Sequence, residues 1–163
     1  MSSIIKERFN IDGKIAIITG ASRGIGTGIA QVFAKHGANV AFTYSSSEAP
    51  ALALEKELSA FGIKAKAYKS NAASFEDSEK LVSQVLQDFG GVIDILINNA
   101  GILRDKTLLK MSDEEWMASI SVNLTGVFYC TRAVVPYMQQ NQYGRIVSAS
   151  STTGLRGNYG QTN

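Results

Sequence analysis

The sequence predicts a doubly wound α/β domain, in which a parallel sheet lies between two layers of helices. Two observations predict this class. Five short apolar runs alternate with segments of helical length, and a chain of 163 residues with 45% hydrophobic content can bury one core. Parallel strands need a crossover, usually a helix, so strict alternation favours a parallel sheet. We expect a single domain over residues 1–163.

The expected strands are the five runs of aliphatic and β-branched residues, which is the composition of parallel strands buried on both faces. They cover residues 15–18, 40–42, 64–69, 92–97 and 146–147. Ligands of such sheets bind beyond the carboxyl ends of the strands. The segments that follow these runs are therefore the places to search for chemistry.

Four helices are expected between the strands. The first ends before Gly37, and the second, over residues 51–61, ends before Gly62, because glycine commonly terminates a helix. Ser74 with Asp77, and Ser112 with Glu115, have the spacing of capping boxes that begin the third and fourth helices. The fourth helix extends to about residue 140, and we expect a kink or break at its proline, residue 136.

Composition excludes several classes of protein. The 16 basic and 14 acidic residues form no run of five like charges, so we expect no nucleic-acid partner. No stretch, at the start of the chain or later, approaches the ~18 apolar residues of a membrane span, so we expect a cytoplasmic protein without a membrane partner. The single cysteine, Cys130, excludes an intrachain disulfide and is expected to be a buried small hydrophobe, and we expect no metal site.

A glycine-rich turn follows the first strand directly and begins the first helix. Its glycines let the backbone turn sharply and approach a pyrophosphate, which free N–H groups and the positive end of the helix dipole would stabilise. No Lys-Ser or Lys-Thr pair follows, which excludes a P-loop, and the alternative is that the glycines only serve a tight turn. The turn predicts a Rossmann-like dinucleotide site, with these candidate residues: Gly20, Ser22, Arg23, Gly24, Ile25 and Gly26.

The end of the second strand indicates which dinucleotide binds. Roughly 20 residues past the turn, an NAD site usually places a carboxylate on the ribose 2′-hydroxyl. Tyr44 and Ser45 stand there instead, and Arg23 in the turn could pair with a 2′-phosphate. We therefore expect NADPH or NADP as the cofactor. The alternative for Arg23 is a solvated surface arginine.

Four segments together resemble the short-chain dehydrogenase/reductase family, in order and spacing along essentially the whole chain. They are Thr19-Gly20-x-x-x-Gly24-x-Gly26, Asn98-Asn99-Ala100-Gly101, Asn123 in Val122-Asn123-Leu124, and Ser151 after the fifth strand. The resemblance implies that Ser151 is the catalytic serine that holds the substrate carbonyl, and that Asn123 bends the fourth helix and holds a water that relays a proton. It places Asn99 near the nicotinamide ribose and Asn71 with Ala72 at the adenine end, and it makes Ala100 and Gly101 further cofactor-binding residues.

The family also has a catalytic Tyr-x-x-x-Lys motif about a dozen residues beyond the serine. This sequence stops at Asn163, just before that position, and Tyr159 stands five positions too early, with no lysine four residues on. The resemblance thus implies a domain truncated at its C-terminal side, without its last strands and helices. We expect this polypeptide alone to be nearly inactive and its parent to be an active oxidoreductase.

The segment from Gly101 to Asp105, with Leu108 and Met111, resembles members of the family that reduce 3-oxoacyl thioesters in fatty-acid synthesis. The substrate would be linked to acyl carrier protein or, as the 160–163 ending also suggests, to coenzyme A. Carrier-protein enzymes tend to have basic residues at the end of the fourth helix, where residues 139–142 are uncharged here. Another ketone or alcohol substrate of the same family is a further alternative.

Apolar residues lie on more than one face of the fourth helix, which favours contact with a partner subunit, and the family implies a tetramer. These residues are Trp116, Ile120, Val127, Phe128, Val134 and Val135.

Two rival classes are a non-catalytic nucleotide-binding module and a methyltransferase-type fold. The first gives no reason for Ser151 and Asn123 at family-like positions, and the second ordinarily has an acidic residue after the second strand.

Overall fold

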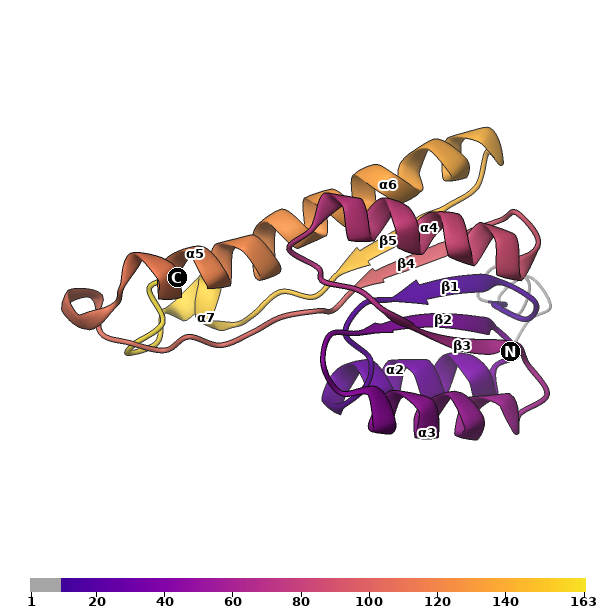
Figure 1. The fold of residues 1–163 in the computed structure, drawn as a ribbon, viewed down its shortest axis with the longest axis horizontal. Coiled ribbons are helices and arrows are strands. Elements are labelled where there is room, and N and C mark those ends of the chain that lie inside the picture. The colour runs from indigo at the N-terminus through magenta and orange to yellow at the C-terminus, as the bar shows by residue number, and fades with distance from the viewer. Residues whose placement is uncertain (1–9) are drawn as a thin grey trace.

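The computed structural model describes residues 10–163 and contains five strands within that range (Figure 1). Helices and strands alternate along the chain as the sequence predicts. In chain order the elements are β1 (Ile15–Ile18), α2 (Gly24–Lys35), β2 (Asn39–Tyr44), α3 (Glu48–Ser59), β3 (Ala65–Lys69), α4 (Phe75–Phe89), β4 (Ile95–Asn98), the 3-10 turn η1 (Leu108–Lys110), α5 (Asp113–Ile120), the π-helical turn η2 (Ser121–Thr125), α6 (Gly126–Gln140), β5 (Arg145–Ser148) and α7 (Thr153–Arg156).

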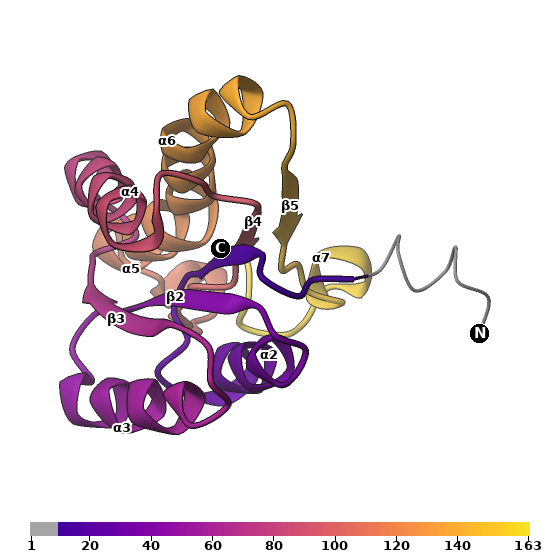
Figure 2. The same ribbon diagram turned by 90° about the vertical axis from the view of Figure 1, so that its right-hand side faces the viewer.

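The sheet is parallel throughout, with the strand order β3-β2-β1-β4-β5. Helices α2 and α3 cover one face, while α4 and α6 cover the other (Figures 1 and 2). The chain leaves β1 in one direction to build β2 and β3, and then returns to add β4 and β5. This reversal puts the carboxyl ends of β1 and β4 side by side, which is where ligands bind in such sheets. The predicted fold class is confirmed.

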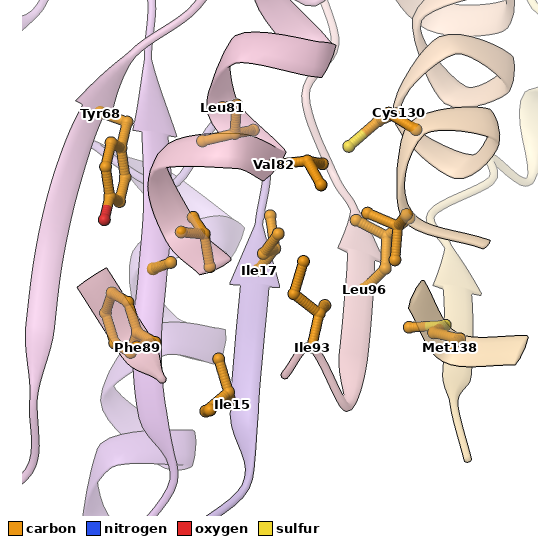
Figure 3. Close-up of a cluster of buried hydrophobic side chains, with 14 residues drawn as sticks. Ile15, Ile17, Tyr68, Leu81, Val82, Phe89, Ile93, Leu96, Cys130 and Met138 are labelled. Atoms are coloured by element: carbon orange, nitrogen blue, oxygen red, sulfur yellow. The ribbon is translucent and has the colours of Figure 1, made fainter. Parts of the chain in front are cut away.

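Two apolar clusters, one on each face of the sheet, form the core. Figure 3 shows the larger cluster, in which Ile17 and Leu96 from the sheet lie between side chains of α4 and α6. Cys130 belongs to this cluster, as expected, and burial raises the pKa of its thiol to about 12. The thiol is therefore protonated at neutral pH and inert.

Several boundaries differ from those expected, for local reasons. Helix α3 begins at Glu48 rather than residue 51, because Pro50 lies in the first turn, where a missing N–H costs nothing. Strand β4 begins at Ile95 rather than residue 92. The Ser74 hydroxyl caps α4 as predicted, but the Asp77 carboxylate accepts from the Asn71 N–H (2.7 Å) instead of completing a capping box. The box of Ser112 and Glu115 is complete.

The fourth expected helix is the main correction. It is interrupted by the π-helical turn at Ser121–Thr125. The predicted break at Pro136 is wrong, because α6 is continuous through that residue, and a kink there stays a prediction. Helix α6 continues through Pro136, which lies on its exposed face, so water can bind the carbonyl that the missing N–H leaves without a partner. The π turn instead contains Asn123, and single π turns inside helices are frequent at functional sites.

Within residues 10–163, no helix has the length and apolar character needed to cross a membrane. The expectation for the start of the chain falls on residues 1–9, outside the described range.

Candidate nucleotide and substrate site

The glycine turn between β1 and α2 is packed too closely against its neighbours to accept side chains at two positions. A Cβ at Gly20 would lie 2.7 Å from the Cα of Ala100, and Gly20 also has a positive φ of 68°. A Cβ at Gly26 would lie 2.6 Å from Nδ2 of Asn99. The turn is therefore pressed against the segment that follows β4. Gly24 has a positive φ and open space beside it, so the backbone there is accessible to a ligand.

A network of hydrogen bonds fixes this turn to the two neighbouring strands. The hydroxyl of Thr19 accepts from the backbone N–H groups of Asn99 and Ala100 (3.0 Å each), and the Asn99 side-chain amide donates to the carbonyls of Thr19 and Gly20. The hydroxyl of Thr43 accepts from the Gly20 N–H (2.9 Å). Sequence reasoning assigned no role to Thr19, although it begins the glycine motif, and it missed Thr43, since a threonine at the end of a strand has no distinctive pattern.

The N-terminus of α2 is open, in contrast to those of α4 and α5. Its cap residue, Arg23, makes no side-chain capping hydrogen bond, and the first turn contains no acidic residue. The first N–H groups of a helix lack intrahelical partners and carry the positive end of the dipole. An anion such as a pyrophosphate fits this arrangement, because it would supply both the acceptors and the negative charge.

A cleft of about 450 Å³ opens above this turn. The thirteen residues predicted to contact the cofactor all line it, together with Thr43, Ser46, Ser47, Ser70, Ile102 and Val122. Their roles toward a cofactor remain predictions, but the fold brings them together from the ends of β1, β2, β3 and β4. A groove of this size and polarity fits an extended dinucleotide.

Among the described residues, those that line the end of the cleft over β2 and β3 include no acidic side chain. The hydroxyl of Tyr44 donates to Glu48 at 3.4 Å, and burial, with the charge of Glu48, raises the pKa of Tyr44. Arg23 is exposed and forms no ion pair with any residue from 10 to 163. The Asn71 side-chain oxygen accepts from Ala73 N–H (3.0 Å), which fixes its loop at the rim.

Ser151 and Asn123 line a second hollow, of about 350 Å³, which shares Ile102 with the cleft. Asn123 pairs with Ile102 through two bonds: its oxygen accepts from the Ile102 N–H (2.8 Å) and its amide donates to the Ile102 carbonyl (3.0 Å). The Ser151 hydroxyl lies 2.8 Å from the Thr153 hydroxyl and accepts from the Thr153 N–H (3.2 Å). The structure thus brings both predicted catalytic residues to one hollow beside the cleft.

Comparison with known proteins gives a consistent result. A 3-oxoacyl-[acyl-carrier-protein] reductase, FabG, from Staphylococcus epidermidis is 41% identical over 92% of this chain and 61% of its own length. The 3-oxoacyl-[acyl-carrier-protein] reductase of Synechocystis sp. is 42% identical over 94% of the chain and 62% of its own length, and FabG of Haemophilus influenzae is 43% identical over 94% and 61%. The chain therefore spans a little over three fifths of the length of these relatives.

The family model described as "short chain dehydrogenase" matches residues 14–163, from the residue before β1 to the last residue. This range includes the glycine turn, the cleft and the hollow with Ser151 and Asn123. The chain belongs to the short-chain dehydrogenase family.

Proposed function

We propose that this chain binds NADPH in the cleft and forms the cofactor half of a reductase that converts 3-oxoacyl thioesters to 3-hydroxyacyl thioesters. The observation that supports it most is the convergence of the thirteen predicted residues on one cleft above the open N-terminus of α2. The names of the relatives support the choice of substrate class.

Arg23 selects NADPH over NADH in this proposal. The pyrophosphate binds the free N–H groups of α2, and the guanidinium of Arg23 binds the 2′-phosphate at the rim. We expect Arg23→Ala to weaken NADPH binding roughly 10- to 100-fold, which is the loss of one or two hydrogen bonds between charged groups, without a change for NADH. Fluorescence titration of the chain with each cofactor measures both affinities.

Arg132→Ala is the matched control, since it removes the same charge from an exposed residue that does not line the cleft. It should leave both affinities unchanged. Tighter binding of NADH than of NADPH by the wild-type chain would contradict the assignment. An equal loss of both cofactors in Arg23→Ala would instead show that Arg23 does not read the 2′-phosphate.

Ser151 and Asn123 serve the reaction centre in this proposal. Bound nicotinamide would supply a hydride to the substrate carbonyl carbon. The hydroxyl and the backbone N–H of Thr153 can both donate to the Ser151 oxygen. The Ser151 O–H is then free to donate to the substrate carbonyl oxygen as negative charge develops there. Asn123 holds the wall of the hollow through Ile102, at the point where the hollow and the cleft meet.

The reductase is tested on protein purified from its native source, by following NADPH oxidation with acetoacetyl-CoA. Removing one hydrogen-bond donor from an oxyanion-type site costs roughly 10²–10³ in kcat, so Ser151→Ala should lose about that much. Ser150→Ala is the matched control, because Ser150 is exposed and does not line the hollow. Equal rates for the two variants would show that Ser151 does not contact the carbonyl.

The carrier of the acyl group is the finer question. The relatives' names specify acyl carrier protein, whereas the end of α6, Gln139 to Gln142, has no basic residue to bind an acidic carrier. We propose the carrier-protein substrate for the parent enzyme, with coenzyme A as the competitor. A higher kcat/KM with acetoacetyl carrier protein than with acetoacetyl-CoA supports this choice, and the reverse order supports coenzyme A.

We also propose that the protein associates with a second copy through α5 and α6. Val134 is buried in the core, but large apolar side chains remain exposed on α5, η2 and α6: Trp116, Met117, Leu124 and Phe128. Contact with a second copy would remove the apolar surface of these side chains from water. Sedimentation of the native protein should show an oligomer, and Phe128→Glu should shift it toward smaller species.

A further inference from the structure

Residues 104–106, on the segment that leaves the cofactor cleft, pair with residues 160–163. The Lys106 N–H donates to the Gly160 carbonyl at 2.8 Å, and Lys106 and Gln161 form an isolated parallel β-bridge. The Asn163 side-chain amide donates to the Arg104 carbonyl at 3.2 Å. Two segments more than fifty residues apart in the sequence therefore lie edge to edge beside the hollow that contains Ser151.

One contact between the two segments joins two side chains: the carboxylate of Asp105 and the amide of Gln161. Its Oδ2 accepts from Nε2 of Gln161 at 2.9 Å, while Oε1 of Gln161 accepts from the amide of Asn158 at 3.1 Å. Both ends of the Gln161 amide are thus fixed. Asp105 forms no ion pair within the described part of the chain, so this amide is its partner there.

These polar contacts replace burial in this part of the molecule. Asp105, Lys106 and Asn158 are exposed, and Gln161 is only partly covered. Gly160 has a positive φ of 80°, and the Gln161 N–H donates to the Asn158 carbonyl at 3.1 Å, so residues 158–161 form a tight turn. A turn without an apolar anchor keeps its position only through such hydrogen bonds.

The same segment is anchored at its other end by Asn123. The paired bonds between Asn123 and Ile102 fix the start of the segment to the π turn, and the bond from Gln161 to Asp105 fixes its continuation to residues 158–163. All of these residues line the hollow together with Ser151. The shape of the hollow therefore depends on both anchors.

We infer that Asp105 is a positioning residue: it holds Gln161 so that residues 158–163 form one wall of the hollow, opposite Ser151 and Asn123. Asp105 does not touch the reacting atoms, and it acts through the amide of Gln161. The inference deepens the proposed function, on which it rests for the identity of the ligand, since the shape of this wall decides how a 3-oxoacyl thioester lies against Ser151.

Hydrogen exchange of the wild-type chain and its variants, measured by NMR, tests the anchor without any ligand. Asp105→Ala should raise the exchange rates of the Lys106 and Gln161 amides roughly five- to tenfold, as expected for the loss of one hydrogen bond of ordinary net strength. Asp105→Asn should exchange at close to the wild-type rate, because its side-chain oxygen can accept the same bond. Asp113→Ala, which removes an exposed carboxylate outside the hollow, should leave these amides unchanged.

Three outcomes of this experiment would overturn the inference. The first is unchanged exchange in Asp105→Ala. The second is equally fast exchange in Asp105→Asn, which would show that the hydrogen bond is not the cause. The third is faster exchange throughout β1 and β2 as well, which would make Asp105 a residue of global stability rather than of local position.

Binding of acetoacetyl-CoA in the presence of NADP, measured by calorimetry, tests the consequence. Asp105→Ala should weaken thioester binding at least severalfold and leave NADPH affinity unchanged, and Asp105→Asn should restore it. Equal thioester affinities in wild type and Asp105→Ala would overturn the role in shaping the hollow, as would a wild-type chain that binds NADPH and no thioester. If the wild-type chain fails to bind NADPH, the proposed function fails, while the exchange result still decides whether Asp105 holds residues 158–163.

Discussion

Two regions of this chain are stabilised in different ways: the strands and turns around the cleft, and the edge formed by β5 with the hollow around Ser151. All four residues of β1 are buried, and the cleft above it is lined almost entirely by residues 20–102. Strand β5 pairs with β4, and all four of its residues are exposed. Ser151, which follows β5, is exposed as well. We call the first region the cofactor part and the second the substrate part, after the functions proposed for them. The strands of the cofactor part are packed in the core, whereas β5 in the substrate part is exposed.

The difference shows what each part needs from its surroundings. The glycine turn is fixed by contacts within residues 15–100, and most of the residues that line the cleft lie in the same range. The hollow around Ser151 relies on exposed side-chain hydrogen bonds, through Asn123 and Asp105. We therefore expect substitutions in the strands beneath the cleft to change global stability, and substitutions in β5 or around the hollow to change local geometry.

The largest contrast should come from the same truncation in β1 and in β5. Ile17 is fully buried in the larger apolar cluster, while the side chain of Ile146 is 40% exposed. Ile17→Ala should lower the free energy of unfolding by about 3–5 kcal/mol, from lost burial and the cavity left behind. Ile146→Ala should lower it by less than about 1 kcal/mol. Urea denaturation measures both, and similar losses would contradict the division into two parts.

Two glycines of the cofactor part should respond in opposite directions to alanine. Gly20→Ala places a Cβ against Ala100 at a positive φ, and should destabilise the fold by about 2–3 kcal/mol and abolish NADPH binding. Gly28 lies inside α2 with open space around it, so Gly28→Ala should stabilise the fold by about 0.5–1 kcal/mol. Thermal unfolding and cofactor titration of the two variants check this pair. A stable Gly20→Ala that still binds NADPH would refute the close packing.

Asp94 ties the beginnings of β1 and β4 together at the end of the sheet away from the cleft. Its carboxylate accepts from the buried Ile15 N–H at 2.9 Å and from Nζ of Lys14 at 3.2 Å. Asp94→Ala leaves the N–H without a partner and should cost about 2 kcal/mol, whereas Asp94→Asn can keep that bond and should cost about half as much. Denaturation curves that coincide for the two variants would show that the charge, and not the hydrogen bond to Ile15, is what stabilises the strands.

The sequence predicted the class of the fold because its apolar runs and glycine turns are local signals. Residues 15–18 and the turn from Gly20 to Gly26 fell where expected, since strand burial and glycine geometry both depend on the residues themselves. A bend at Asn123 was implied only by the resemblance, because the residues of this helix give no local signal for it and the two hydrogen bonds of Asn123 go to Ile102, twenty-one residues away. Pro136 misled for the opposite reason: it is a strong local signal whose cost water removes at an exposed position.

The candidate site shows the same limit. The thirteen cleft residues follow strand ends, so topology alone brings them together once the sheet is parallel. The roles of Thr19 and Thr43 were not predicted, because their hydroxyls accept hydrogen bonds from backbone N–H groups far away in the sequence. The contact between Asp105 and Gln161 was missed because fifty-six residues separate them.

The smallest expected effect concerns Asp88, which contacts the edge strand β3 through partly exposed polar side chains. In this respect β3 resembles the hollow around Ser151, where side-chain hydrogen bonds also take the place of burial. Its Oδ2 accepts from Nζ of Lys66 and from the hydroxyl of Tyr68, both at 2.7 Å, and these bonds lower the pKa of Asp88. A lowered folded-state pKa contributes stability that is present above the unfolded value of about 4 and is lost as the pH falls through the folded value. The contribution should be below about 1 kcal/mol, because the pair is partly exposed and screened by salt. The stability difference between wild type and Asp88→Asn, measured by denaturation from neutral pH down through pH 4, should therefore shrink in acid and in high salt. A difference that does not vary with pH would show that packing, and not the carboxylate charge, accounts for the role of Asp88.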